Sequence, residues 1–181
     1  MEDHVCPSWL YFSLNSFFRK IIHDPEKLFK EYVHEGDTAL DIGCGPGFFT
    51  LGLAGLAGKT GKVIAVDIQK KAIDTVEKKI RGTIYENIVH PVLSDGITFP
   101  VNDKIDFALT FWMLHEVPDK KNFLEMLRGF MKPGSKYLLV EPRIHVMKET
   151  FMREVKIAES CGMKLAGFPE IGLSRAALFT V

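Results

Sequence analysis

The chain has 181 residues, with 23 acidic and 23 basic side chains and a formal net charge of zero. This length accommodates one domain with a sizeable core, and the balanced charge, without a long basic run, argues against a nucleic-acid-binding protein. The odd, widely spaced cysteines Cys6, Cys44 and Cys161 indicate reduced thiols, and the N-terminus lacks the cationic start of a secretory signal. No apolar run is long enough to span a bilayer, and no His/Cys/Asp spacing is typical of a metal site. We therefore expect a cytoplasmic protein without integral membrane association and without a metal.

Residues 1–35 are predicted to form a helical segment, separate from a main domain over residues 36–181. Between Pro7 and Ile22 an apolar stripe follows helical spacing. The stripe consists of Leu10, Leu14, Phe17, Phe18 and Ile21. This helix either packs on the rest of the protein or covers a substrate as a lid. Trp9 and Phe12 fall off the stripe, which suits a pocket mouth, a dimer contact or a membrane surface.

Strands then alternate with helices, the pattern of a doubly wound parallel α/β sheet. The predicted helices are Pro25–Val33, Phe48–Ala57, Lys70–Arg81, Lys120–Met131 and Lys148–Cys161. The predicted strands are Thr38–Ile42, Val63–Asp67, Ile88–Leu93, Ile105–Thr110, Tyr137–Glu141, Met163–Phe168 and Arg175–Val181. We expect a Rossmann-like, seven-stranded, mostly parallel sheet whose last two strands are antiparallel to each other.

The segment Asp-Ile-Gly-Cys-Gly-Pro-Gly from Asp41 to Gly47 is the most informative part of the chain. An acidic residue ends a strand, glycines allow a sharp turn close to a ligand, and a helix begins at Phe48 with free N–H groups. A dinucleotide site would have G-x-G-x-x-G, so the third glycine stands one place too early. A carboxylate at Asp41 suits a ligand with positive charge beside its nucleoside, and S-adenosylmethionine is such a ligand.

A second acid, Asp67, ends the next strand, 20 residues after Gly47. This spacing places a carboxylate beside the ribose in nucleotide-binding βαβ units. The alternative is that Asp67 caps the helix beginning near Lys70. A third acid, Asp95, follows the next strand in a Ser-Asp-Gly sequence that is also typical of an ordinary turn.

With these motifs, residues 36–181 resemble a class I S-adenosylmethionine-dependent methyltransferase, closest to the UbiE-like, type 11 small-molecule branch. The resemblance implies that Asp95 reaches the adenine amino group and that Ile68 lies against the adenine. It implies a cofactor site made of Asp41, Gly43, Cys44, Gly45, Gly47, Phe48, Asp67, Ile68, Asp95, Gly96 and Thr110, with Cys44 contributing its backbone. Two alternatives remain open: a non-catalytic module that binds S-adenosylmethionine, and a short nucleotide-dependent Rossmann reductase.

The loop after Thr110 lacks the Asn/Asp-Pro-Pro-aromatic motif of methyltransferases that modify nucleobase amines. Its Leu-His-Glu-Val-Pro-Asp sequence resembles small-molecule methyltransferases, which points to a small, partly apolar acceptor. His115 is a candidate general base, or fixes the loop by hydrogen bonding. Trp112 and Met113 offer a wall for a cation, or belong to the core. The predicted acceptor pocket consists of Trp9, Trp112, Glu141 and His145. The sequence leaves the oligomeric state open.

Overall fold

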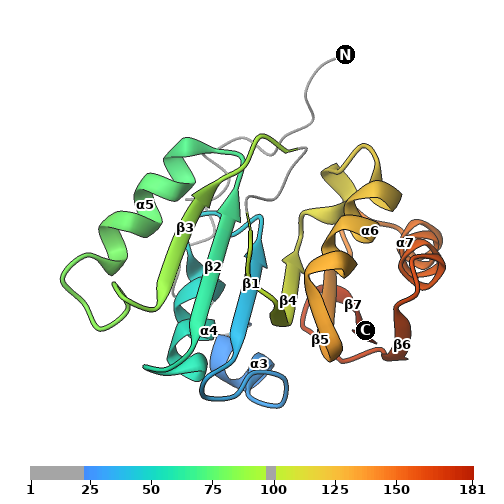
Figure 1. The fold of residues 1–181 in the computed structure, drawn as a ribbon. Helices are drawn as coiled ribbons and strands as arrows, with labels where there is room; N and C mark the ends of the chain where they lie inside the picture. Colours follow the sequence, from blue (N-terminus) through green and yellow to red (C-terminus); the bar gives the residue numbers. More distant parts are fainter. Residues whose placement is uncertain (1–22, 97–100) are drawn as a thin grey trace.

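The computed structural model describes residues 23–96 and 101–181, in which seven strands form one sheet with the order β3-β2-β1-β4-β5-β7-β6 (Figure 1). The strands are β1 (Thr38–Ile42), β2 (Lys62–Asp67), β3 (Val89–Leu93), β4 (Ile105–Phe111), β5 (Met131–Pro142), β6 (Lys164–Gly167) and β7 (Ser174–Thr180). The first five pair in parallel, and β7 is antiparallel to both β5 and β6. The predicted mixed sheet with an antiparallel last strand is confirmed.

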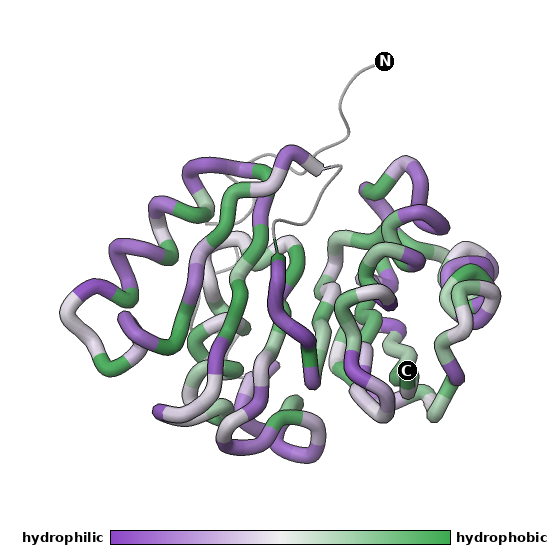
Figure 2. The backbone as a smooth tube through the Cα atoms, in the orientation of Figure 1, coloured by the Kyte–Doolittle hydropathy of each residue, from purple (hydrophilic) through white to green (hydrophobic). Residues whose placement is uncertain are grey.

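The helices cover both faces of the sheet. They are α3 (Pro25–Phe29), α4 (Phe48–Ala57), α5 (Lys70–Ile80), the 3₁₀ turn η1 (Leu114–Glu116), α6 (Lys120–Phe130) and α7 (Lys148–Ser160). Buried side chains of α3, α4 and α5 form one core cluster, and those of α6 and α7 form a second on the opposite face. Hydropathy along the backbone shows apolar central strands, while α5 alternates between apolar and polar residues (Figure 2). Among the described residues, none of the helices is long and apolar enough to pass through a bilayer.

Alternation along the strands decides which face each site residue occupies. In β1, Ala39 belongs to the α4 cluster, and Leu40 and Ile42 belong to the α6/α7 cluster. Asp41 therefore points toward α4, and by the same alternation in β2 so does Asp67. In β5, Tyr137 and Leu139 belong to the α6/α7 cluster, so Glu141 lies on that face.

Several predicted boundaries are wrong by a few residues. The first described helix ends at Phe29 instead of Val33, because the chain continues in turns in which Tyr32 and Val33 donate backbone hydrogen bonds to Phe29. Strand β5 begins at Met131, where the predicted helix had its last residue, and a register irregularity separates Met131 from the regular pairing that starts at Lys136. The predicted helix over residues 7–22 lies outside the described residues.

Candidate functional site

The glycine turn, residues 43–47, is hydrogen-bonded to the end of the neighbouring strand β2. The backbone N–H groups of Gly43 and Cys44 donate to the carbonyl of Val66 at 2.8 and 3.0 Å. The N–H of Gly45 donates to Asp67 Oδ2 at 2.8 Å. Gly43 and Gly45 have φ values of +72° and +52°, in the left-handed region that glycine tolerates best. The turn is thus held in one shape at the carboxyl edge of the sheet, directly beside Asp67.

The start of α4 is fixed against the same edge. Asp41 is buried, and its Oδ2 accepts a hydrogen bond from the Thr50 hydroxyl in the first turn of α4 at 2.6 Å. Gly47 precedes α4 with φ +81°, and a Cβ at this position would lie 2.9 Å from Val76 Cγ2 of α5. Asp41 therefore joins β1 to α4, and Gly47 allows α4 and α5 to approach each other closely.

Asp67 supports the backbone just ahead of α5, where Gln69 and not Asp67 is the N-cap residue. Asp67 Oδ1 accepts from the N–H of Gln69 at 2.8 Å, at the entrance of α5, in addition to the Gly45 bond to Oδ2. Burial raises the pKa of this carboxyl, and its backbone hydrogen bonds oppose the shift. Each carboxylate oxygen has further acceptor capacity, since one N–H occupies only one of its lone-pair directions. The two backbone hydrogen bonds that Asp67 accepts are therefore compatible with ribose binding by the same carboxylate.

Ile68 and Gly96 lie side by side next to Asp67. Ile68 is 48% exposed, which is unusual for an isoleucine directly after a buried strand. A Cβ on Gly96 would lie 3.5 Å from Ile68 Cγ2, and the Gly96 N–H donates to Ser94 Oγ at 3.0 Å. Asp95, between Ser94 and Gly96, is exposed. The exposed side chain of Ile68, with the exposed Asp95 nearby, is consistent with the predicted contacts to an adenine ring and its amino group.

The side chain of Thr110 points to the other face of the sheet. Its hydroxyl lies 2.7 Å from the Tyr137 hydroxyl, and both residues are fully buried. Any contact of Thr110 with a ligand at the glycine turn would thus use its backbone. The Cys44 thiol is also buried, and burial raises its pKa well above the ordinary value, so it is a poor nucleophile.

His115 and Glu141 form the polar contact of greatest chemical interest. His115 Nδ1 lies 2.5 Å from Glu141 Oε2, and the His115 backbone N–H donates to Glu141 Oε1 at 3.0 Å. Glu141 is fully buried, whereas the His115 side chain is 25% exposed. Burial by itself would lower the His115 pKa, but the hydrogen bond and negative charge of Glu141 outweigh it and raise that pKa above 6.5. The loop-fixing role of His115 is therefore seen in the structure, and its role as a general base stays a prediction.

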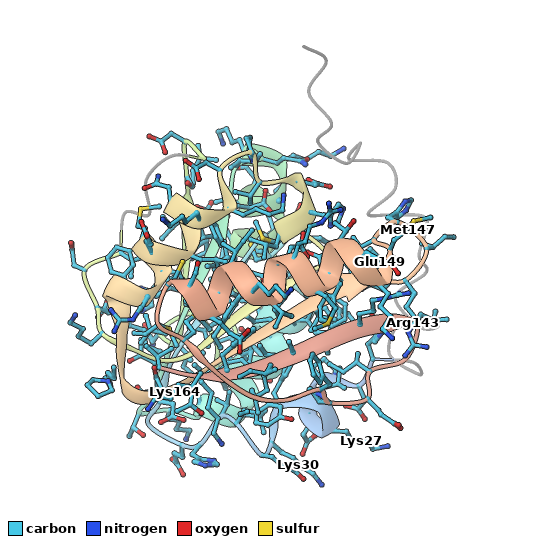
Figure 3. The ribbon with its side chains drawn as sticks, turned by 90° about the vertical axis from the view of Figure 1, so that its right-hand side faces the viewer. Lys27, Lys30, Arg143, Met147, Glu149 and Lys164 are labelled. Carbon is cyan, nitrogen blue, oxygen red and sulfur yellow. The ribbon has the colours of Figure 1, made fainter. Side chains whose placement is uncertain are left out.

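Of the other predicted acceptor residues, the structure describes Trp112 and His145. Trp112 is half-buried with φ +61°, and its Nε1 donates to Ser174 Oγ at 2.9 Å. Its ring meets His23 edge-on, with the ring centroids 5.5 Å apart. His145 is exposed in the turn after β5, near the start of α7 where Figure 3 shows Met147 and Glu149 beside Arg143. Trp9 lies outside the described residues.

Sequence reasoning missed two residues beside the His115–Glu141 pair. Lys120 Nζ donates to the carbonyls of His115 and Val117 at 3.2 and 2.8 Å, which fixes η1. Glu154 of α7 is buried among apolar neighbours. Glu154 stands three residues after Phe151 and next to Val155, so helical spacing places its carboxyl on the apolar face of α7. This spacing could have identified Glu154 as a buried acid from the sequence.

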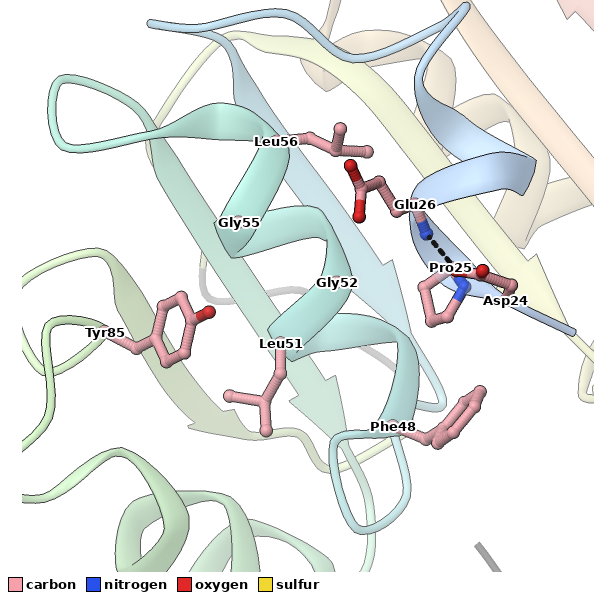
Figure 4. A pocket seen from close by; sticks show the side chains of 9 residues that line it. All are labelled: Asp24, Pro25, Glu26, Phe48, Leu51, Gly52, Gly55, Leu56 and Tyr85. Atoms are coloured by element: carbon pink, nitrogen blue, oxygen red, sulfur yellow. Dashed lines mark hydrogen bonds between the residues drawn. The ribbon is translucent and has the colours of Figure 1, made fainter. Parts of the chain in front are cut away.

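A cavity of about 430 Å³ lies on the outer side of α4, between α3 and Tyr85 (Figure 4). It is lined by Asp24, Pro25 and Glu26 at the start of α3 and by residues of α4, of which Phe48 is the one predicted cofactor residue. This cavity therefore does not coincide with the acidic edge formed by Asp41 and Asp67. Within residues 23–96 and 101–181, no group of three or more His, Cys, Asp or Glu side chains is arranged to hold a metal ion.

Comparison with known proteins agrees with this geometry. A family model described as a methyltransferase domain matches residues 33–167. The chain belongs to the methyltransferase domain family. Within this family it is 34% identical over 118 residues to the demethylmenaquinone methyltransferase of Lactobacillus johnsonii, covering 64% of this chain and 48% of that relative. It is 28% identical over 138 residues to the 2-phytyl-1,4-naphtoquinone methyltransferase of Nostoc punctiforme, covering 71% and 60%.

A solved methyltransferase has the same fold as this chain. The crystal structure of a SAM-dependent methyltransferase from Aquifex aeolicus superposes with a TM-score of 0.87 at 24% identity, covering 98% of this chain and all of that one. The predicted resemblance to class I, UbiE-like methyltransferases is thereby confirmed. The chain spans only about half the length of the demethylmenaquinone methyltransferase relative.

Proposed function

We propose that this protein binds S-adenosylmethionine at the glycine turn and transfers its methyl group to a small, partly apolar acceptor of the quinol class. The observation that carries the proposal is the glycine turn itself, hydrogen-bonded to Asp67 and Val66 beside Asp41. The names of the two relatives, both methyltransferases of naphthoquinone-type molecules, support the acceptor class.

The residues at this edge fit the proposed cofactor. Asp67 offers carboxylate lone pairs for the ribose hydroxyls, Ile68 offers an exposed apolar surface for the adenine, and Asp95 stands next to it. Asp41 supplies negative charge beneath the turn, which favours a cationic ligand. When bound, S-adenosylmethionine supplies an electrophilic methyl group, so the protein itself needs to align the acceptor, exclude water and accept a proton.

His115 is proposed to accept that proton. Its Nδ1 faces Glu141 Oε2, so the Nδ1–H tautomer leaves Nε2 unprotonated as the acceptor atom. Methylation of a quinol ring carbon replaces a hydrogen, and a base is needed to remove it. The buried carboxylate of Glu141 stabilises the imidazolium that forms, which is the usual role of an acid behind a catalytic histidine.

The acceptor is proposed to lie between Trp112, His115, Glu141 and the N-terminal segment, with His145 and Trp9 as further contacts. Residues 1–22 of the predicted segment 1–35 would then act as a lid over the main domain, residues 36–181, because Phe29 and Val33 already belong to its core. Deletion of residues 1–22 should abolish methyl transfer while leaving most of the cofactor affinity. Full turnover by the shortened protein would reject the lid.

Two measurements test the function. Calorimetry with S-adenosylmethionine, its demethylated product and NAD separates a methyltransferase from a reductase, and binding of NAD alone would reject the proposal. Transfer of labelled methyl groups to demethylmenaquinone in its reduced form tests the acceptor class. Cofactor binding without turnover on any quinol would favour the non-catalytic module. Cytoplasmic location and the absence of nucleic-acid binding remain predictions from the sequence.

A further inference from the structure

Glu154 occupies a position on α7 where the helix pattern calls for an apolar residue. The buried face of α7 consists of Phe151, Glu154, Val155 and Ala158. Glu154 is 1% exposed, and neither of its carboxylate oxygens has a hydrogen-bond partner among the described residues. Burying a carboxylate without a hydrogen-bond partner costs free energy. This cost falls when the carboxyl takes up a proton or when a positive charge lies nearby.

The groups that act electrostatically on Glu154 come from every element around it. Glu141 at the end of β5 is an unfavourable negative neighbour, whereas His115 of η1, Lys120 of α6 and Arg153 of α7 are favourable positive ones. Tyr137 of β5 responds to both Glu141 and Glu154. Lys120 is bonded to two backbone carbonyls, and Arg153 is exposed and bonded to Thr150. Neither cation forms a hydrogen bond with the Glu154 carboxylate.

Both carboxylate oxygens of Glu141 contact the histidine. Its Oε1 accepts from the His115 backbone and its Oε2 contacts His115 Nδ1. Two buried carboxyl groups, Glu141 and Glu154, therefore act on a single imidazole, together with the half-buried Glu116, whose Oε1 lies 3.9 Å from His115 Nε2. We call the imidazole and the two buried carboxyls the His115–Glu141–Glu154 cluster. Two buried carboxyls that repel each other electrostatically do not ionise independently, so the second ionises at a higher pH unless a positive charge stabilises it.

We propose that Glu154 is a positioning residue for His115: its buried carboxyl, beside Glu141, sets the charge of the His115–Glu141 pair and thereby the protonation of His115 Nε2. This inference deepens the proposed function and rests on it for its catalytic meaning. The ionised carboxyl of Glu154 favours the imidazolium form of His115, so it strengthens Nε2 as a proton acceptor. When the bond between the acceptor and its hydrogen breaks and an N–H bond forms at Nε2, the electron pair stays on the acceptor, and the charges of Glu141 and Glu154 stabilise the new imidazolium.

The electrostatics of both groups support this coupling. Burial, and after it the charge of Glu141, raise the pKa of Glu154 from 4.5 to about 7. After Glu141 and Glu116, the charge of Glu154 is in turn among the causes that raise the His115 pKa above 6.5. The charge of each group therefore depends on the charge of the other.

The test follows the titration of His115 in cofactor-free protein, so it does not depend on turnover. Protein with isotope-labelled histidine is titrated by NMR, and the His115 signals are assigned from their loss in His115→Asn. Glu154→Gln should lower the His115 midpoint and turn a broad, coupled titration into a simple one. Glu159→Gln, an exposed acid on the same helix, should leave both unchanged.

Glu154→Met provides a second variant suited to the apolar face if the glutamine variant does not fold, and it should lower the midpoint in the same way. An unchanged His115 titration in the folded variants would overturn the inference, even if methyl transfer is observed. A shifted titration without any methyl transfer would instead reject the proposed function. Where an acceptor is identified, the pH–rate profile of Glu154→Gln should move to lower pH with little change in KM.

Discussion

At the scale of single residues, Asp67 connects the fold to the proposed cofactor. It accepts N–H groups from both the glycine turn and the start of α5. Asp67→Ala should weaken binding of S-adenosylmethionine by about 1–3 kcal/mol, the scale of losing charge-assisted hydrogen bonds. Calorimetry checks the value, with Asp74→Asn, an exposed acid of α5, as control. Unaltered affinity would mean that Asp67 only supports the backbone ahead of α5.

His115 gives a second prediction at this scale. If Nε2 accepts the proton, His115→Asn should reduce the rate of transfer by about 10²–10⁴-fold, the usual contribution of a general base, without weakening cofactor binding. Because the His115 pKa is raised, the wild-type rate should increase with pH and reach its plateau above the range expected for an ordinary histidine. His90→Asn, in the edge strand β3, serves as control. A rate that does not change with pH would contradict the role.

The sequence identified most of the candidate site at this scale, because glycines and acids at strand ends carry local signals. Asp41, Gly45 and Asp67 lie at one edge of the sheet, as the pattern of strand, acid, glycine turn and helix predicted. The pairing of His115 with Glu141 joins residues 26 positions apart, and only the register between β4 and β5 determines it. Thr110 was predicted near the cofactor, but strand alternation directs its hydroxyl to Tyr137 instead.

At the scale of elements, the contact between α4 and β2 depends on a glycine. A Cβ on Gly61 would lie 2.4 Å from the Ala57 carbonyl oxygen and 2.8 Å from that of Asp37, and these backbone atoms have little room to move. Gly61→Ala should therefore destabilise the protein by about 1–3 kcal/mol, as overpacking does. Gly129→Ala, in α6 with nothing within 4 Å of the added Cβ, should stabilise it by about 0.4–1 kcal/mol.

Urea denaturation of both variants measures this difference. Equal stability of the two alanine variants would show that the backbone around Gly61 rearranges at little cost. The existence and type of the described elements were predictable from periodicity, while η1 and the early start of β5 were not. Both depend on distant partners: Glu141 and Lys120 hold η1, and the start of β5 pairs with Ile105.

At the scale of the whole molecule, the sheet separates two kinds of chemistry. Asp41 and Asp67 lie on the face covered by α4 and α5, and Thr110, Tyr137 and Glu141 lie on the face covered by α6 and α7. Both sets reach the carboxyl edge of the parallel strands, where ligands of such sheets bind. The proposed cofactor residues and the proposed base thus meet at one edge although their supporting cores are separate.

This arrangement predicts how stability depends on pH. His115 and Glu154 both have a higher pKa in the folded protein than their ordinary values. The folded state then binds more protons than the unfolded chain, so the free energy of unfolding falls as pH rises through each interval. For Glu154 this interval runs from pH 4.5 to about pH 7. The raised pKa of His115 causes a further loss of stability above pH 6.5.

Glu154→Gln should remove the part of this pH dependence that Glu154 contributes, a difference of about 3 kcal/mol between pH 4.5 and about pH 7. Urea denaturation of wild type and variant at about pH 5 and about pH 8 measures it, since the slope with pH is independent of any packing change that the amide introduces. Glu159→Gln should retain the wild-type slope, because its side chain is exposed on the outer side of α7. Equal slopes for wild type and Glu154→Gln would mean that the carboxyl finds a partner on folding and ionises normally. The buried acid would then contribute to packing alone, and the control of His115 would rest with Glu141.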